Sequence, residues 1–300
     1  KNYKINSIER EKIFMNITNF KWSLEKCIHC GKCLKVCPGD LFIFDDKNEL
    51  KIKEIDCFGW DGCWQCDHCL AVCPTGAISI FNKDPQNSVT LPDYQDAGKM
   101  MSALVRTRRA CRRYLNKDVD KKIIKELMGS IQYAPTGGNK RKLEFTIIDD
   151  CKEMDYFRLL VRDEMIKLAN NGIYPQGFDK TSYNQMMAWE KSVRPDSIFC
   201  GAPHILIPHA PKNIPCAVQD VNMAAAYFEL LCNANGLGAI CMSYPLAVLG
   251  NMPNVMKLLQ IPEDHYISLM VGFGYPEIRY ARGVQREENG KIKRIVFTQD

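Results

Sequence analysis

The sequence has few of the residues on which hydrolytic or nucleotide-dependent chemistry depends. Its 300 residues include five histidines, dispersed along the chain, and neither a GxSxG nor an HExxH motif. The stretch "TGGNK" ends like a phosphate-binding loop, but no glycine precedes it at the required spacing and no serine or threonine follows it. "GLGAI" has no third glycine in place, so it does not indicate a dinucleotide-binding Rossmann site. These absences argue against hydrolases, zinc proteases and nucleotide hydrolysis.

Long apolar runs are also missing. The most apolar helical stretch, "NMAAAYFELLCNANGLGA", is interrupted by Glu229 and by asparagines, and a membrane helix needs roughly 18 apolar residues. We therefore expect a cytoplasmic protein with no membrane segment.

The charge is unevenly distributed along the chain. The formal net charge is +5. Residues 1–95 hold 12 Lys+Arg and 13 Asp+Glu, and the remaining residues hold 28 Lys+Arg and 22 Asp+Glu. An anionic ligand is expected in the larger, C-terminal part.

Cysteine is abundant and unevenly placed. Nine of the 15 cysteines fall between Cys27 and Cys73. A disulfide framework is not expected, because such frameworks are typical of short secreted domains and no signal peptide is visible. Cys57 lies outside the regular spacing and is interpreted as an incidental thiol. The other six have no ligand spacing and are expected to be small buried side chains: Cys111, Cys151, Cys200, Cys216, Cys232 and Cys241.

Two repeated runs, "CIHCGKCLKVCP" and "CWQCDHCLAVCP", contain eight of these cysteines. In a C-x2-C-x2-C-x3-C-P run three thiolates bind one 4Fe-4S cluster, and the fourth serves the other cluster when two runs are present. The spacing predicts one cluster on Cys27, Cys30, Cys33 and Cys73, and a second on Cys63, Cys66, Cys69 and Cys37. Zinc is the main alternative, but it would leave four cysteines and both prolines without a role. About residues 20–82 resemble a bacterial-type two-cluster ferredoxin domain.

Beyond this region, helical and strand-like patterns alternate. A polar linker at 83–98 separates residues 1–82 from residues 99–300. The patterns predict helices at 99–106, 118–134, 152–170, 181–193 and 218–236, and strands at 143–149, 203–210, 239–243 and 265–274. Asp118 is predicted to cap the second helix, Pro135 to stop it, and Gly236 to close the last. The predicted class is α+β, with a layered α/β sheet domain after the small ferredoxin-like domain.

The run "RTRRACRRY" at 106–114 places five arginines within eight residues. Alone, it would also suit a solvated face or a nucleic-acid patch. It is followed by "YAPTGGNKRKLEF", "GAPHILI", "NANGLGAICMSYP" and "GFGYPEIRYARGVQRE". In this order, over about residues 99–297, these stretches resemble the landmarks of the FMN-dependent nitroreductase family.

That resemblance implies an FMN site without a catalytic side chain, since flavin N5 is the redox centre. The arginines would bind the flavin phosphate and ribityl chain, for which planar guanidinium groups are suited. Asn139 would contact the flavin's polar edge, and Met242–Tyr244 would lie along the isoalloxazine. The implied cofactor-binding set is Arg108, Arg109, Ala110, Arg112, Pro135, Thr136, Gly137, Asn139, Arg141, Met242, Ser243, Tyr244, Arg282 and Arg286.

The sequence departs from the family pattern at three places. Ala110 replaces a usual hydroxyl residue, and Arg141, Lys142 and Leu143 stand where Gln-Pro-Trp is common. Ser243 and Tyr244 occupy positions where glycines are frequent. The phosphate site thus keeps its arginines, whereas the face toward the electron acceptor differs. Aromatic candidates for stacking on the acceptor, each of which would equally suit ordinary packing, are Trp189, Tyr174 and Phe178.

Together, the two resemblances imply a homodimeric FMN-dependent oxidoreductase. Electrons would pass from two 4Fe-4S clusters to FMN and on to a small nitro, quinone or other conjugated acceptor. An external ferredoxin or another low-potential donor would supply them, and no nucleic acid or membrane partner is expected. Two alternatives remain open: an electron-transfer protein that serves a protein partner, and an FMN-dependent enone reductase or dehydrogenase.

Overall fold

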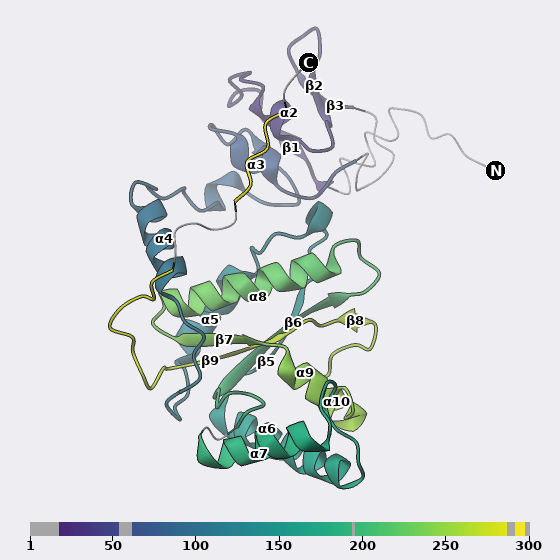
Figure 1. Ribbon diagram of the computed structural model, residues 1–300. Coiled ribbons are helices and arrows are strands. Elements are labelled where there is room, and N and C mark those ends of the chain that lie inside the picture. The colour runs from purple at the N-terminus through teal and green to yellow at the C-terminus, as the bar shows by residue number, and fades with distance from the viewer. Residues whose placement is uncertain (1–17, 54–61, 194–195, 287–291, 298–300) are drawn as a thin grey trace, which may run out of the picture. The chain divides into compact units, whose positions relative to one another are not determined.

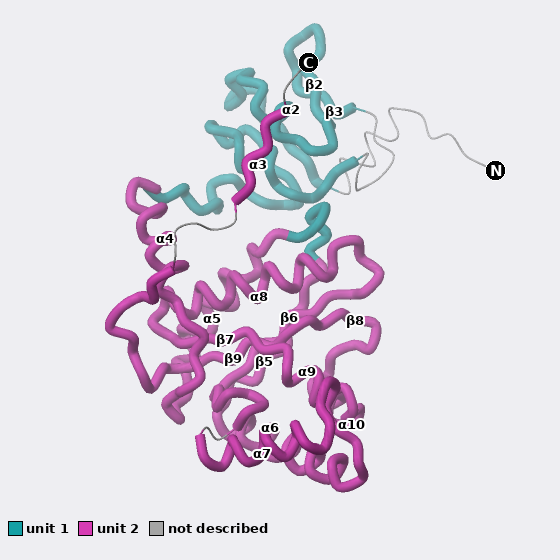
Figure 2. Tube along the Cα trace, viewed as in Figure 1, with its two compact units in different colours: residues 1–93, 136–141 teal, residues 94–135, 142–300 magenta. Residues whose placement is uncertain are grey.

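The computed structural model describes residues 18–53, 62–193, 196–286 and 292–297, and Cys57 lies outside these ranges. The chain divides into two compact units (Figure 2). Unit 1 holds the described residues up to Asp93 together with Thr136–Arg141, and unit 2 holds Tyr94–Pro135 and the described residues from Lys142 onward. The division after Asp93 falls within the predicted linker, whereas the grouping of Thr136–Arg141 with unit 1 was not predicted.

Among its described residues, unit 1 contains two short antiparallel strand pairs, β1 with β4 and β2 with β3, and two short helices that pack against each other. Its core is a small cluster of buried side chains that includes Phe20, Phe42 and Ile78. The elements are β1 (Lys21–Trp22), α2 (Lys32–Val36), β2 (Phe42–Phe44), β3 (Leu50–Ile52), α3 (His68–Val72), β4 (Ile78–Ser79) and a 3-10 turn at Pro85–Asn87.

The two cysteine runs have the same backbone conformation. His29 and Gln65 have φ angles of 54° and 52°, and Gly31 and Asp67, which directly precede α2 and α3, have φ angles of 67° and 59°. Glycine adopts such positive angles without cost, and aspartate is one of the few other residues that tolerate them. The repeat in the sequence is therefore also a repeat in the structure.

Unit 2 is built on one antiparallel sheet of strand order β5-β6-β9-β7, with the short β8 paired to β6 (Figure 1). The strands are β5 (Glu144–Ile148), β6 (His204–Pro211), β7 (Gly238–Met242), β8 (His265–Tyr266) and β9 (Met270–Gly274). The helices are α4 (Ala97–Thr107), α5 (Lys121–Ile131), α6 (Cys151–Asn170), α7 (Lys180–Ser192), α8 (Ala217–Ala234), α9 (Tyr244–Leu249) and α10 (Pro253–Leu258), with a 3-10 turn at Gly137–Asn139 in the part grouped with unit 1. The predicted α+β class is confirmed.

Helices cover both faces of this sheet, because β6 is apolar on both sides. Ile205 and Ile207 contribute to the core under α6, α7, α9 and α10, whereas Leu206 faces α5 and α8. All three side chains are fully buried. Figure 1 shows the sheet lying between these two helical layers. Within the described ranges, no helix combines the length and apolarity that a bilayer span requires.

The long apolar helix α8 ends where the sequence predicted. Gly236 has φ 73°, its N–H donates to the carbonyl of Asn233, and the N–H of Leu237 donates to the carbonyl of Cys232 at 2.9 Å. These are the two hydrogen bonds of a Schellman motif, which satisfies carbonyls at the helix end.

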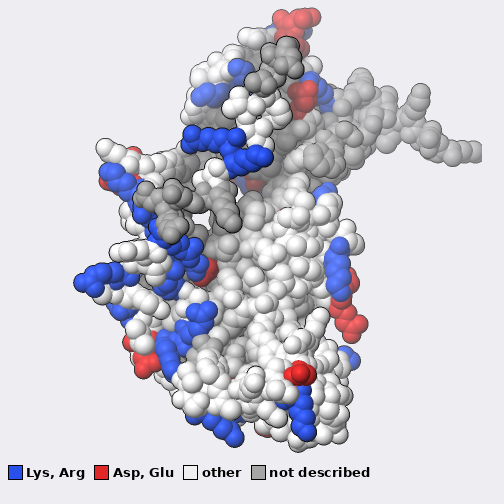
Figure 3. Space-filling model, in the orientation of Figure 1, with Lys and Arg blue, Asp and Glu red and all other residues white. Residues whose placement is uncertain are grey.

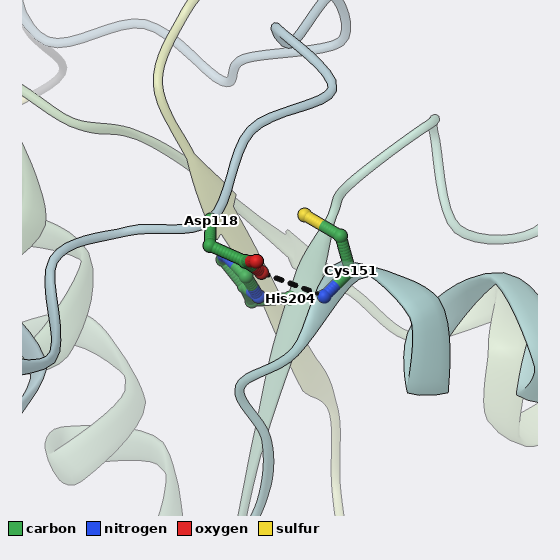
Figure 4. Close-up of side chains that lie close together, drawn as sticks. All are labelled: Asp118, Cys151 and His204. Carbon is green, nitrogen blue, oxygen red and sulfur yellow. Dashed lines mark hydrogen bonds between the residues drawn. The ribbon is translucent and has the colours of Figure 1, made fainter.

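The predicted cap of the helix after the arginine run is wrong. Asp120, not Asp118, caps α5 by accepting a hydrogen bond from the N–H of Lys122. Asp118 instead accepts from the N–H of Cys151 at 2.7 Å, so it binds the first N–H of the distant helix α6, whose own N-cap is Asp150 (Figure 4). That long-range contact could not be found from local sequence.

Two further differences concern the end of the chain. The strand predicted at 265–274 is interrupted. Its two parts, β8 and β9, both pair with β6, and β9 also pairs with β7. The short helices α9 and α10 were not predicted. Each has a proline in its first turn, a position where the missing N–H costs no hydrogen bond.

Gly238 at the start of β7 permits a close backbone approach that the arginine run requires. A Cβ placed there would lie 2.6 Å from both Cβ and Sγ of Cys111. We expect Gly238→Ala to destabilise the protein by about 1–3 kcal/mol through overpacking, seen as a lower midpoint of thermal unfolding by circular dichroism.

The matched control for this substitution is Gly129→Ala in α5, where a Cβ meets nothing within 4 Å. Alanine in an exposed helix is favoured over glycine by up to about 1 kcal/mol, so the midpoint should hold or rise. Equal midpoints for Gly238→Ala and the wild type would contradict the close approach.

Candidate functional site

Two cavities in unit 1 are lined by separate sets of four cysteines. One set is Cys27, Cys30, Cys33 and Cys73. The other is Cys37, Cys63, Cys66 and Cys69. In each cavity the fourth cysteine comes from the opposite run, which is the division that the spacing predicts. Four thiols at a largely apolar wall are a donor set that fits a 4Fe-4S cluster.

Backbone N–H groups point at several of these sulfur atoms. Ala77 donates to Cys73 Sγ at 3.2 Å, Gln65 to Cys63 Sγ at 3.4 Å and Leu41 to Cys37 Sγ at 3.5 Å. Such bonds stabilise thiolate charge and tune the potential of a bound cluster.

Burial has the opposite effect on the free thiols. It raises the pKa of Cys63 to about 11 and that of Cys69 to about 12, so both are protonated at neutral pH in the absence of metal. Iron binding must therefore displace protons from these side chains.

The charges beside the two cavities differ. Lys32 lines the first cavity, whereas Asp67 lines the second. Asp67 also forms an ion pair with Lys83, so part of its charge is compensated.

In unit 2, the arginine run lies against the edge strand β7. Ala110 forms a parallel bridge with Ala239, and the N–H of Cys111 donates to the carbonyl of Ala239 at 2.9 Å. Because β7 leads directly into Met242, Ser243 and Tyr244, the sheet brings these three residues to the same strand as the arginine run. Two separate parts of the predicted FMN site thus share one structural support.

The C-terminal segment returns to the same edge. The N–H of Glu277 donates to the carbonyl of Arg113 at 3.0 Å, and a Cβ on Gly283 would lie 3.4 Å from the side chain of Thr107. Arg282 and Arg286, which flank this part of the segment, are exposed. Figure 3 shows lysine and arginine side chains gathered over the edge that carries α4 and the loop after it.

The arginines of the run have different surroundings. Arg108 forms a 2.6 Å ion pair with Glu229 of α8, and Arg112 donates to the carbonyl of Ala110. Arg109 donates through a terminal nitrogen to the carbonyl of Arg106, but its buried Nε has no hydrogen-bond partner among the described residues. A buried donor without an acceptor fits a site that receives an anion, because leaving it unpaired costs free energy.

The loop from Pro135 to Arg141 is divided between the two units. Pro135 belongs to unit 2, whereas Thr136, Gly137, Asn139 and Arg141 are grouped with unit 1. Thr136 Oγ1 accepts a 3.0 Å hydrogen bond from the N–H of Arg141. Within unit 1, the amide of Asn139 donates to the carbonyls of Trp64 and Gln65 at 3.0 Å. These bonds occupy the amide that the resemblance assigns to the flavin edge, and that role stays a prediction.

Aromatic residues pack around Tyr244 at the start of α9. The ring of Phe178 lies 5.2 Å from the Tyr244 ring, and the Tyr244 hydroxyl lies 2.8 Å from Met186 Sδ. Burial, with a smaller effect from Glu190, raises the pKa of Tyr244 to about 12, so the phenol remains neutral.

Of the three aromatic residues proposed to stack on the acceptor, Phe178 packs on Tyr244 of the predicted isoalloxazine segment. Tyr174 packs on Tyr183 with ring centroids 5.6 Å apart, and Trp189 is 38% exposed.

Met186 and the Arg108–Glu229 ion pair were not identified from the sequence as parts of the site. Glu229 could have been noticed, because it is a charged residue within an otherwise apolar stretch of α8 and therefore needs a partner of opposite charge.

Comparisons with known proteins match both parts of the chain to known families. The family described as the nitroreductase family matches residues 105–275, more than half of the chain, and a 4Fe-4S dicluster domain matches residues 26–77. Iodotyrosine deiodinase of Thermotoga neapolitana is 24% identical over 184 residues, which cover 60% of this chain and 90% of that protein.

Solved structures show the same fold. A nitroreductase with bound FMN from Bacteroides fragilis is 16% identical and matches 67% of this chain and 98% of its own, with a TM-score of 0.50. A nitroreductase with bound FMN from Desulfitobacterium hafniense is 17% identical and matches 64% of this chain and 96% of its own, also with a TM-score of 0.50.

The arginine run on β7, the returning C-terminal segment and the family match lead to one assignment, and the paired cysteine runs add a second. The chain belongs to the nitroreductase family of FMN-dependent oxidoreductases and carries a 4Fe-4S dicluster domain before its nitroreductase domain.

Proposed function

We propose that this protein passes electrons from two 4Fe-4S clusters to FMN and on to a small nitro, quinone or other conjugated acceptor. The observation that carries the proposal is the presence, in one chain of the nitroreductase family, of two separate four-cysteine cavities. A cluster domain transfers single electrons, so its fusion to a flavin-type oxidoreductase points to internal electron supply. When bound, FMN exchanges one or two electrons and so links single-electron carriers to two-electron reductions.

The residues proposed for each cofactor follow from the site. The eight cysteines of the two cavities would hold the clusters. Arg108, Arg109, Arg112, Arg282 and Arg286 would bind the FMN phosphate, and the unpartnered Nε of Arg109 supports this part of the proposal. Met242, Ser243 and Tyr244 would flank the flavin ring, with Phe178 beside them.

The protein would act as a homodimer in the cytoplasm, where thiols stay reduced. Helix α8 is the proposed interface. Its buried face packs on the sheet, yet Val218, Met223 and Tyr227 on its other side are 46%, 37% and 46% exposed. A ferredoxin-type protein or another low-potential donor would supply the electrons, and the arginine run would serve the cofactor, not nucleic acid.

The cysteine cavities predict the metal content. Anaerobically purified protein should contain about eight irons and eight acid-labile sulfides per chain, since each cavity would hold one 4Fe-4S cluster. Cys30→Ala and Cys66→Ala should each lose about half of this iron, measured by iron and sulfide analysis. Cys216→Ala, outside both runs, is the control and should keep full iron. Zinc in place of iron would reject the assignment.

The arginine arrangement predicts the effect of losing a phosphate donor. Arg109→Ala and Arg286→Ala should each lower the FMN content of purified protein while iron stays unchanged, because charge-assisted bonds to phosphate act together. FMN is measured by absorbance after heat release. Lys122→Ala removes the same charge from the exposed surface of α5 and should leave FMN content unaltered. Full flavin retention in both arginine variants would show that other residues bind the phosphate.

Electron delivery through the clusters predicts that turnover depends on them only when a protein supplies the electrons. With reduced ferredoxin as donor, Cys66→Ala should lower the steady-state rate of acceptor reduction by an order of magnitude or more. Direct reduction of FMN by dithionite should change little, because the reductant reaches the flavin without the clusters. Stopped-flow and steady-state absorbance measure the two rates in FMN-loaded protein, with Cys216→Ala as control.

Equal turnover by Cys66→Ala and the wild type would reject the clusters as the route. The acceptor panel should include a nitroaromatic, a quinone, an enone and, because of the Thermotoga relative's name, iodotyrosine. Rapid oxidation by a protein acceptor, with slow oxidation by every small molecule, would instead identify an electron-transfer protein.

A further inference from the structure

Three side chains of types that can ligate metals meet on one face of the sheet in unit 2, apart from the residues of the proposed flavin site. They are Glu144 of β5, His209 of β6 and His265 of β8. One ligand atom from each lies within 4.8 Å of the others. The sequence alone did not suggest this group, because its members are far apart along the chain.

Strand register explains the convergence. Glu144 is the antiparallel partner of His209, and directly opposed residues place their side chains on the same face of a sheet. His265 is brought to the same place by the pairing of β8 with the end of β6. The Nδ1 atoms of His209 and His265 lie 2.8 Å apart, and the two rings are 3% and 9% exposed.

A hydroxyl group lies beside His209. Thr146 Oγ1 is 3.2 Å from His209 Nε2 and 3.5 Å from the carbonyl oxygen of Leu259. In the tautomer in which Nε2–H donates to Oγ1, the lone pair of His209 is on Nδ1 and faces His265. This is the state in which imidazole binds metals, with the second nitrogen held by an outer hydrogen bond.

The distances are close to those of a metal site. Zinc–nitrogen bonds of 2.0–2.1 Å in tetrahedral geometry separate two ligand nitrogens by about 3.3 Å. The hydrogen-bonded histidine pair would have to open by about 0.5 Å and give up the proton that lies between the two Nδ1 atoms. Glu144 is exposed, which allows its carboxylate to move toward the histidines. Two imidazoles and one carboxylate are a donor set that zinc and related divalent metals favour.

We propose that Glu144, His209 and His265 bind one divalent transition-metal ion of the zinc class. The ion would join three strands, and water would complete its coordination. Binding of this ion would require neither the clusters nor FMN. Because β8 has only two residues, a metal bond to His265 would add substantially to its attachment to the sheet.

A second group of similar composition has no histidine lone pair available to a metal. In the group of Asp118, Cys151 and His204 (Figure 4), His204 Nε2 accepts from the N–H of Val119 at 3.0 Å. The proton of the neutral ring must therefore be on Nδ1, so neither nitrogen has a lone pair free for a metal. Asp118 is already bonded to the backbone of Cys151. That group ties a loop to α6 and β6.

Zinc binding by the full-length protein tests the proposal. Protein with its iron intact would be dialysed anaerobically against a chelator, and zinc affinity would be measured by competition with a chromophoric chelator. We expect one zinc per chain beyond the iron. Glu144→Gln should weaken binding by about tenfold or more, and Thr146→Val, which removes the outer hydrogen bond, by about 10–100-fold. Glu126→Gln, an exposed carboxylate on α5, should have no effect.

X-ray absorption at the zinc edge separates this site from the cysteine runs. Zinc at the proposed site should show nitrogen and oxygen neighbours at about 2.0–2.2 Å, whereas zinc on cysteines shows sulfur at about 2.3 Å. A sulfur shell, or no zinc bound beyond the iron, would overturn the proposal. So would unchanged affinity in both Glu144→Gln and His265→Gln, with thermal unfolding confirming that each variant is folded.

Discussion

The hydrogen bond from the N–H of Cys111 to the carbonyl of Ala239 is the contact on which the arrangement of unit 2 depends. It attaches the arginine run to β7, whose other end leads into Met242–Tyr244. The contact is possible because Gly238 has no side chain at the point of closest approach. Through this contact, the arginine run and the segment proposed to lie along the flavin ring are attached to the same strand.

The returning C-terminal segment strengthens this arrangement. Tyr114 bridges to Pro276, and Glu277 bonds to Arg113, so residues after β9 run beside residues before α5. Arg108 is further fixed by Glu229 of α8, a pair whose carboxylate side chain is only 12% exposed. An ion pair of this kind holds the arginine in place, and an incoming phosphate would compete with Glu229 for it.

Much of the fold was predictable from local pattern. Helix ends such as Gly236 follow from glycine's conformational freedom, and the buried strand at 203–210 follows from its unbroken apolar run. The division of cysteines between two cavities followed from spacing alone. Features that depend on distant contacts were not predictable. They are the hydrogen bond that Asp118 accepts from the first N–H of α6, the bonds from Asn139 to backbone carbonyls of unit 1, and the interruption of 265–274 between β8 and β9. Local sequence carries no information about which distant group completes a hydrogen bond.

The two cysteine runs share one backbone shape, but Gly31 in the first corresponds to Asp67 in the second, and Lys32 lines only the first cavity. A nearby positive charge stabilises the reduced form of a cluster, and a negative charge disfavours it. Two clusters held in these cavities would therefore differ in reduction potential, with the one on Cys27, Cys30, Cys33 and Cys73 easier to reduce. Although the two cysteine runs offer the same ligands, an electron in this domain would thus reside mainly on one of the two clusters.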